Sequence, residues 1–140
     1  MRESYHLAIQ NETKARTFCA ELGALPQPNT LEMGYLGAGK MVLAKYEYFP
    51  LQKYQLFIQG KALLEKAIST QRNNLELRYL RYGIQMNCPA FLNYSSNLSE
   101  DKNYLLKNTS ALEDKDLKKR IITFLALYGN LNDGERKMLQ

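Results

Sequence analysis

Two segments of the chain share one pattern: residues 29–39 read NTLEMGYLGAG and residues 73–83 read NNLELRYLRYG. At an offset of 44 residues, six of the eleven positions are identical, and Met33 pairs with Leu77 as a conservative seventh. Self-similarity at a fixed offset of about 20–50 residues is typical of repeat architectures. The repeat therefore predicts stacked helical hairpins, which present a surface to a partner, and it indicates no chemical reaction.

Signals for helix starts recur along the chain. A capping residue followed three positions later by glutamate occurs at Asn29/Glu32, Asn73/Glu76, Ser110/Glu113 and Asn132/Glu135. The cap side chain accepts a hydrogen bond from a free N–H of the first turn, and the glutamate reaches back to the N–H of the cap. Ser99, followed by Glu100 and Asp101, predicts a fifth start, because acidic residues suit the positive end of a helix.

Signals for helix ends complete the pattern. Gly23, Pro26 and Pro28 end the first predicted helix, and Pro50 and Pro89 end the second and fourth, because proline lacks an N–H donor and disfavours a helical residue before it. The predicted helices cover residues 3–22, 30–47, 51–71, 74–87, 99–108, 111–129 and 133–139. Apolar residues at helical spacing support them, in the stripes Phe57, Leu64, Ala67 and Ile68, and Leu117, Ile121, Phe124, Leu125 and Tyr128.

The third predicted helix resembles the second helix of a tetratricopeptide repeat. The likeness rests on Gly60, Leu64 and Ala67, and on the asparagines 73–74 that follow the helix. Arg72 stands where that family usually has proline, and the offset of 44 residues exceeds the family's repeat of about 34. We therefore predict an all-α, tetratricopeptide-like stack of helical hairpins with six or seven helices in a right-handed superhelix, forming a single helical-repeat domain over residues 1–140.

Composition narrows the class of protein. With 140 residues and 45% hydrophobic residues, the chain can bury a core that needs no disulfide bonds or metal ions to stabilise it. Two cysteines and one histidine are too few for a disulfide framework or a histidine-based metal cluster, so we predict no cofactor and expect buried, apolar cysteines. The sequence has no apolar run of the ~18–20 residues that a membrane span needs. It begins without the apolar stretch of a signal peptide, which predicts a cytoplasmic chain, or alternatively an exported or periplasmic one whose leader has been removed.

Residues 34–41, GYLGAGKM, match the phosphate-binding P-loop pattern up to Met41. The P-loop needs a serine or threonine there to ligate magnesium, and it follows a buried strand. Here a helix cap precedes the segment. Gly34, Gly37 and Ala38 lie three to four positions apart, so they share one helix face and predict the close approach of a neighbouring helix.

The basic residues are concentrated in the middle of the chain. Residues 40–81 contain eight basic and three acidic residues, a net charge of +5, and the remainder sums to zero. Two repeat positions that are Gly34 and Gly37 in the first copy are Arg78 and Arg81 in the second. Tyrosine and arginine are enriched at binding hot spots, and arginine grips carboxylate or phosphate with two donors. The candidate binding residues are Arg78, Arg81, Gln85, Tyr82 and Tyr46.

A purely structural role for these arginines is the alternative. In that interpretation Arg78 and Arg81 pair with Glu47, Glu76 or Asp101 and order the structure. The loop over residues 88–101 carries Phe91, Leu92 and Tyr94, which we expect to pack beneath it more than to face outward.

The segments AKYEYFPLQKY (44–54) and ELRYLRYGIQMNCPAFLNYSSNLSEDK (76–102) resemble a family of uncharacterised bacterial proteins. The resemblance covers most of the chain, with its core at residues 35–107. It implies a small, all-helical, tetratricopeptide-like protein. The family has no assigned activity and so supplies no catalytic residues. Its members often begin with an export signal.

Three hypotheses for function follow. The first is a non-enzymatic module that binds a protein or peptide through the second hairpin. The second is an enzyme or an anion-binding protein that uses Arg78 and Arg81 on a small acidic ligand, and the third is a structural subunit. Nucleic acid is disfavoured despite a pI of about 9.2, because the basic residues are interspersed along three helices.

Overall fold

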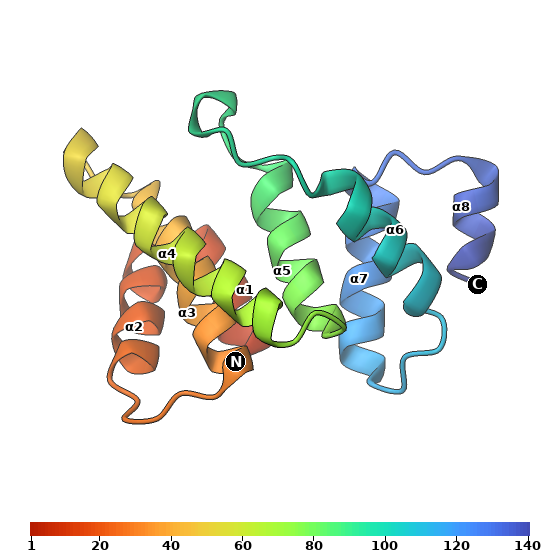
Figure 1. Ribbon diagram of the computed structural model, residues 1–140, viewed down its shortest axis with the longest axis horizontal. Helices are drawn as coiled ribbons and strands as arrows, with labels where there is room; N and C mark the ends of the chain where they lie inside the picture. The colour runs from red at the N-terminus through yellow and green to blue at the C-terminus, as the bar shows by residue number, and fades with distance from the viewer. The chain divides into compact units, whose positions relative to one another are not determined.

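The computed structural model describes residues 1–140 and contains eight α-helices, one short 3₁₀ helix and no strand (Figure 1). The predicted all-α class is therefore confirmed, and the helices are compatible with a stack of hairpins. The chain divides into two compact units, residues 1–80 and 81–140, and the division falls inside one helix, α5 (Leu75–Met86). Repeats contact mainly their neighbours, so compact units are not by themselves separate domains. The single domain stays a prediction.

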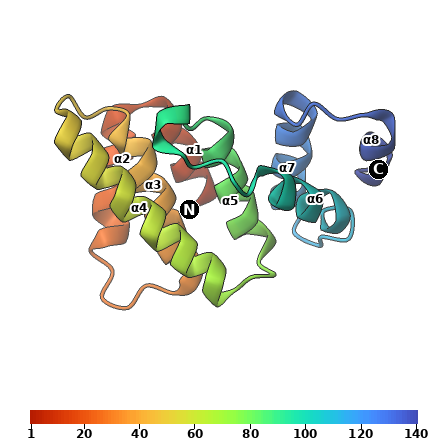
Figure 2. The ribbon, with the colours of Figure 1, turned by 45° about the horizontal axis from the view of Figure 1, so that its top comes forward.

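The N-terminal unit contains α1 (Arg2–Gln10), α2 (Glu12–Gly23), α3 (Thr30–Ala44), α4 (Pro50–Thr70) and the first turns of α5. Figures 1 and 2 both show α4 lying along α3. The most deeply buried large side chains of this unit are Tyr35, Leu64 and Leu77, from α3, α4 and α5. Burial of these faces drives the packing, because each fully buried large apolar side chain contributes about 1.5–3 kcal/mol.

Glycines set the contact between α3 and α4. A Cβ atom added to Gly37 would lie 2.6 Å from the backbone oxygen of Gly60, and one added to Gly60 would meet the backbone oxygen of Gly37. Gly34 in turn faces the side chain of Leu77. The GYLGAGKM segment thus lies within a helix whose small residues let α4 approach closely, as the sequence predicts.

The first predicted helix, residues 3–22, is wrong in one respect, because two helices occupy this range. Asn11 has extended backbone angles (φ −147°, ψ 126°), and its side chain accepts a hydrogen bond from the Lys14 N–H. A short polar side chain that binds its own backbone competes with the helix interior, so Asn11 ends α1 and caps α2. This break accounts for the eighth helix.

The predicted helix caps have mixed outcomes. Complete capping boxes form at Asn29/Glu32 and Asn132/Glu135, as predicted. The other two predictions are wrong, because the neighbouring residues Asn74 and Asp114 accept hydrogen bonds from the N–H groups of Leu77 and Leu117. The helix predicted at 111–129 therefore begins at Lys115. Pro50 does not simply end the preceding helix, since it lies in the first turn of α4.

The C-terminal unit contains the rest of α5, the 3₁₀ helix η1 (Ala90–Leu92), α6 (Leu98–Asn108), α7 (Lys115–Tyr128) and α8 (Asp133–Met138). Its core is formed by Leu105, Ile121 and Leu125, each with no exposed surface. Tyr128, predicted to share the buried stripe of α7, is 57% exposed and lies outside the core.

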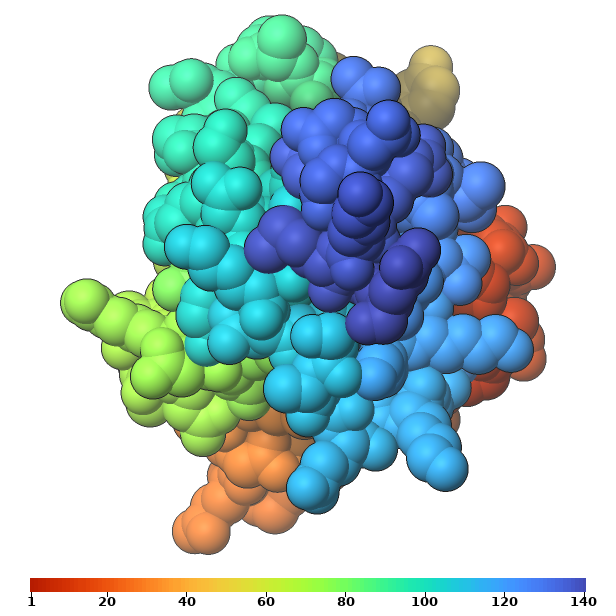
Figure 3. Space-filling view, turned by 90° about the vertical axis from the view of Figure 1, so that its right-hand side faces the viewer, coloured from red at the N-terminus to blue at the C-terminus, as the bar shows by residue number.

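A salt bridge connects α6 and α8 of the C-terminal unit, whose side chains are in contact in Figure 3. Lys102 Nζ lies 3.3 Å from Glu135 Oε2. The pKa of Glu135 is lowered by its hydrogen bond from the Asn132 backbone and by Lys102. No helix of the protein combines the length and apolar character that crossing a bilayer requires.

Candidate functional site

Arg81, the central candidate from the sequence, forms a buried ion pair within the C-terminal unit. Its Nε lies 2.7 Å from Asp101 Oδ2 and its NH2 group 2.8 Å from Asp101 Oδ1. The side chains of Arg81 and Asp101 are 5% and 0% exposed. The structural alternative, pairing with Asp101, is thus confirmed for Arg81.

Gln85 and Tyr82 are also buried in the C-terminal unit. Gln85 donates from Nε2 to the side-chain oxygen of Asn97 at 3.0 Å and accepts from the Asn97 backbone N–H at 3.1 Å. The Tyr82 ring packs edge-on against Phe124, with centroids 5.8 Å apart. Burial, followed by the charge of Glu135, raises the pKa of the Tyr82 hydroxyl. Gln85 therefore anchors the end of the loop that begins after α5.

Arg78 and Tyr46 make hydrogen bonds within the N-terminal unit. Arg78 is 9% exposed, and its Nε donates to the backbone oxygen of Arg72 at 2.9 Å. The Tyr46 hydroxyl donates to the backbone oxygen of Ile9 at 2.9 Å, and Lys45 donates to the same oxygen at 2.6 Å. Ile9 lies in the last turn of α1, where carbonyl groups have no helical partner. Tyr46 and Lys45 therefore complete the end of α1.

The five candidate residues do not converge on one cavity. Four of them are buried, Tyr46 is half-buried, and each makes at least one internal contact. Arg78, Arg81 and Gln85, which stand at helical spacing on α5, are thus buried and do not form an exposed polar face. A role for these five residues in binding a ligand stays a prediction. The large apolar side chains that are exposed on the chain are other residues.

A second buried polar cluster was not foreseen. It joins the two copies of the repeat, because the Tyr35 hydroxyl donates to the carboxylate of Glu76. Arg2 adds two contacts to Glu76, from Nε at 2.6 Å and from NH2 at 3.0 Å. Burial and the Glu76 contact raise the pKa of Tyr35, and burial raises that of Tyr5, whose ring packs edge-on to Tyr35. This cluster fixes α1 and α3 to the start of α5.

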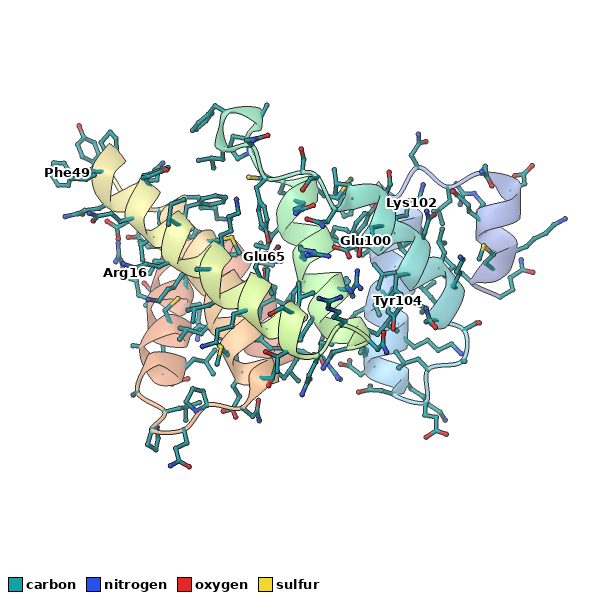
Figure 4. All side chains as sticks on the ribbon, viewed as in Figure 1. Arg16, Phe49, Glu65, Glu100, Lys102 and Tyr104 are labelled. Atoms are coloured by element: carbon teal, nitrogen blue, oxygen red, sulfur yellow. The ribbon has the colours of Figure 1, made fainter.

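The first turns of α4 are exposed on every side. Each residue from 48 to 55 is exposed, so this segment packs less closely than the later turns of α4, which bury Phe57, Gly60 and Leu64. The large apolar side chains gathered here are Tyr48 (88% exposed), Phe49 (60%), Leu51 (68%), Tyr54 (54%) and, one turn on, Ile58 (42%). We call these five side chains the α4 surface. Figure 4 shows Phe49 at the outer end of α4.

Two features shape the α4 surface. The Tyr48 and Phe49 rings pack edge-on with centroids 5.3 Å apart, which makes one aromatic wedge at the end of the helix. An open depression of about 360 Å³ lies beside it, lined by Tyr54, Gln55, Ile58 and Gln59. The sequence signal for this surface was partial: Tyr48 and Tyr54 belong to the tyrosine-rich segment, whereas Ile58 is recognisable only because it falls outside the buried stripe of α4.

Other chemistry has less support in the described chain. No group of three or more histidine, cysteine, aspartate or glutamate side chains is placed to hold a metal ion. Cys19 and Cys88 are free and half-buried, so they are less buried than expected. Burial raises the pKa of the Cys19 thiol, which disfavours a reactive thiolate.

Comparisons with protein-family models, with curated proteins and with solved structures found no match to this chain.

Proposed function

We propose that this chain is a non-enzymatic, tetratricopeptide-like helical module that binds a protein or peptide through the α4 surface. The observation that carries the proposal is the exposure of five large apolar side chains on one short segment of the N-terminal unit. Exposed apolar patches of this kind mark interaction sites. The segment is helical from Pro50 onward, so the backbone sets the spacing of these side chains.

The proposal retains the second hairpin of the sequence analysis and moves the contact residues within it. Arg81 has two of its guanidinium N–H groups committed to Asp101, so displacing that carboxylate would break a buried ion pair. Binding at the α4 surface breaks no such ion pair, because the side chains of this surface are already exposed to water. Tyrosine and phenylalanine contribute large contact areas with few rotatable bonds, which favours them as hot-spot residues.

A selection from a library of displayed random peptides tests the proposal. The full chain should enrich a set of related peptides, and the double variant Tyr54→Ser with Ile58→Ser should lose at least about tenfold in affinity for them, or roughly 1.4 kcal/mol. The matched control is Leu127→Ser with Tyr128→Ser, which alters two equally exposed side chains of the C-terminal unit. Circular dichroism confirms that each variant is folded.

Two results would overturn the proposal. The first is the absence of any enriched peptide, and the second is unchanged binding by the Tyr54/Ile58 variant. Measurement of the molecular mass in solution tests whether a second copy of the chain covers the α4 surface. In that case the parent chain has the mass of a dimer, and the Tyr54/Ile58 variant has the mass of a monomer.

A further inference from the structure

Within the segment that carries the α4 surface, the side-chain charges have one sign. From residue 48 to residue 64 the chain contains no acidic residue. The nearest acid in sequence, Glu47, is 3.1 Å from the guanidinium of Arg16, which also contacts Glu12 at 2.8 Å. Arg16 thus offsets only one of these two carboxylates, and the Glu12–Arg16–Glu47 group keeps a net charge of −1 beside the residue that precedes Tyr48.

Positive charges surround the same side chains. Lys53 is exposed within residues 48–58, and Lys45 is exposed three residues before Tyr48. Lys40 reaches the depression from α3, where its Nζ donates to Gln59 Oε1 at 3.0 Å. Exposed charges within a Debye length of about 8–10 Å add to one local potential.

The helix backbone adds to this potential. The α4 N-cap, Phe49, provides no side-chain hydrogen bond, and the first turn contains no acidic residue. The positive end of the helix dipole thus stays uncompensated at the position where Tyr48 and Phe49 project. This arrangement differs from α3 and α8, which have acidic residues in their first turns.

We infer that the partner of the α4 surface is an acidic polypeptide segment with apolar side chains, whose aspartate or glutamate residues face Lys53 and Lys45. The inference rests on the proposed function and names the chemistry of the partner. Its apolar side chains contact the aromatic wedge and the depression at Tyr54 and Ile58, while its carboxylates meet the only charge sign that the segment exposes. Complementary charge of this kind selects partners and speeds encounter.

An array of short synthetic peptides tests the inference. Three sets have the same apolar residues and differ only in net charge, which is strongly negative, zero or strongly positive. We expect the full chain to bind the acidic set best, and raising the salt from about 0.05 to 0.5 M should reduce this preference because the Debye length shortens. Lys53→Glu should weaken binding to the acidic set by roughly fivefold, the size that one or two exposed ion pairs give.

The controls separate the possible results. Lys115→Glu makes the same charge change at an exposed position of the C-terminal unit and should leave the charge preference intact. Equal binding to all three sets, lost in the Tyr54/Ile58 variant, would overturn the acidic partner and retain the proposed function. Binding to no set would overturn both. Sedimentation with phosphatidylcholine vesicles containing one-third phosphatidylglycerol, in the absence of peptide binding, would overturn the inference in favour of a lipid surface.

Discussion

At the residue scale, the most informative change between the two repeat copies is glycine to arginine. Gly37 allows α3 and α4 to touch backbone to backbone, whereas the equivalent Arg81 places a cation against Asp101 of α6. Both residues allow close packing at their positions. Gly37 does so because it has no side chain, and Arg81 does so because its charge is paired with that of Asp101. A pair this deeply buried is sensitive to loss of one member, because the other is then left without compensation.

Arg81→Met should therefore destabilise the C-terminal unit by about 3–5 kcal/mol, since the buried Asp101 carboxylate would lose both of its hydrogen bonds from the guanidinium. The double variant Arg81→Met with Asp101→Leu should recover most of this loss, because it removes both charges together. Urea unfolding followed by circular dichroism measures the difference. A single variant within about 1 kcal/mol of the parent chain would show that the pair is dispensable.

Tyr5 and Tyr35 give a second prediction, which concerns alkaline pH. Their pKa values are raised in the folded chain, mainly by burial, so the neutral hydroxyls are favoured by folding. The stability they contribute is complete below the ordinary tyrosine pKa of about 10 and falls as the pH rises above it. Tyr5 and Tyr35 should therefore ionise only with loss of helix.

Ultraviolet absorbance of tyrosinate, recorded together with circular dichroism during a pH titration, checks whether the last tyrosines ionise only as helix is lost. Tyr35→Phe removes the hydroxyl and should take one tyrosine out of the late phase. Full ionisation of all ten tyrosines before any helix is lost would contradict the buried cluster.

At the element scale, the close contact between α3 and α4 depends on glycines, which have no side chain. Gly37→Ala should destabilise the N-terminal unit by about 1–3 kcal/mol, because the new Cβ would lie 2.6 Å from the Gly60 backbone oxygen and neither backbone can yield cheaply. Gly23→Ala is the matched control: nothing lies within 4 Å of its added Cβ, so the change should be neutral or stabilising. Thermal unfolding compares the two, and equal effects would argue against the glycine contact.

Helix caps, apolar stripes and packing glycines were predictable where the residues that determine them lie close together in the sequence. Capping at Asn29, the stripe Phe57–Leu64–Ala67 and the packing glycines follow from neighbours a few residues apart. The break at Asn11 was missed because no glycine or proline marks it, so the only signal was the low helix propensity of asparagine. Competition between adjacent caps was also unresolved, since Asn73 and Asn74 are chemically the same and only the three-dimensional turn decides between them.

The candidate site was less predictable because burial of a polar stripe depends on distant residues. Arg78, Arg81 and Gln85 have the spacing of one polar helix face. Asp101 and Asn97, which come from other elements, cover Arg81 and Gln85. The arginines that the sequence offered as binding residues are buried, whereas the apolar side chains at the start of α4 are exposed.

At the scale of the whole molecule, each unit closes its own core and the apolar side chains left outside are not evenly spread. Phe91 of the loop over residues 88–97 is 84% exposed, and its neighbour Tyr94 is 4% exposed, so this loop presents one side chain and anchors another. Residues 48–58, in contrast, present five. The N-terminal unit therefore offers the larger contact surface, and the α4 surface is the central claim about function.

The most direct test is to map the contact by nuclear magnetic resonance. The ¹⁵N-labelled full chain is titrated with the acidic peptide that binds best, and backbone amide shifts are followed. We predict that the largest changes cluster between residues 45 and 61, and that they are lost in the Tyr54→Ser, Ile58→Ser variant. Changes centred on residues 78–85, with residues 48–58 unaffected, would contradict the account and return the binding site to the arginines.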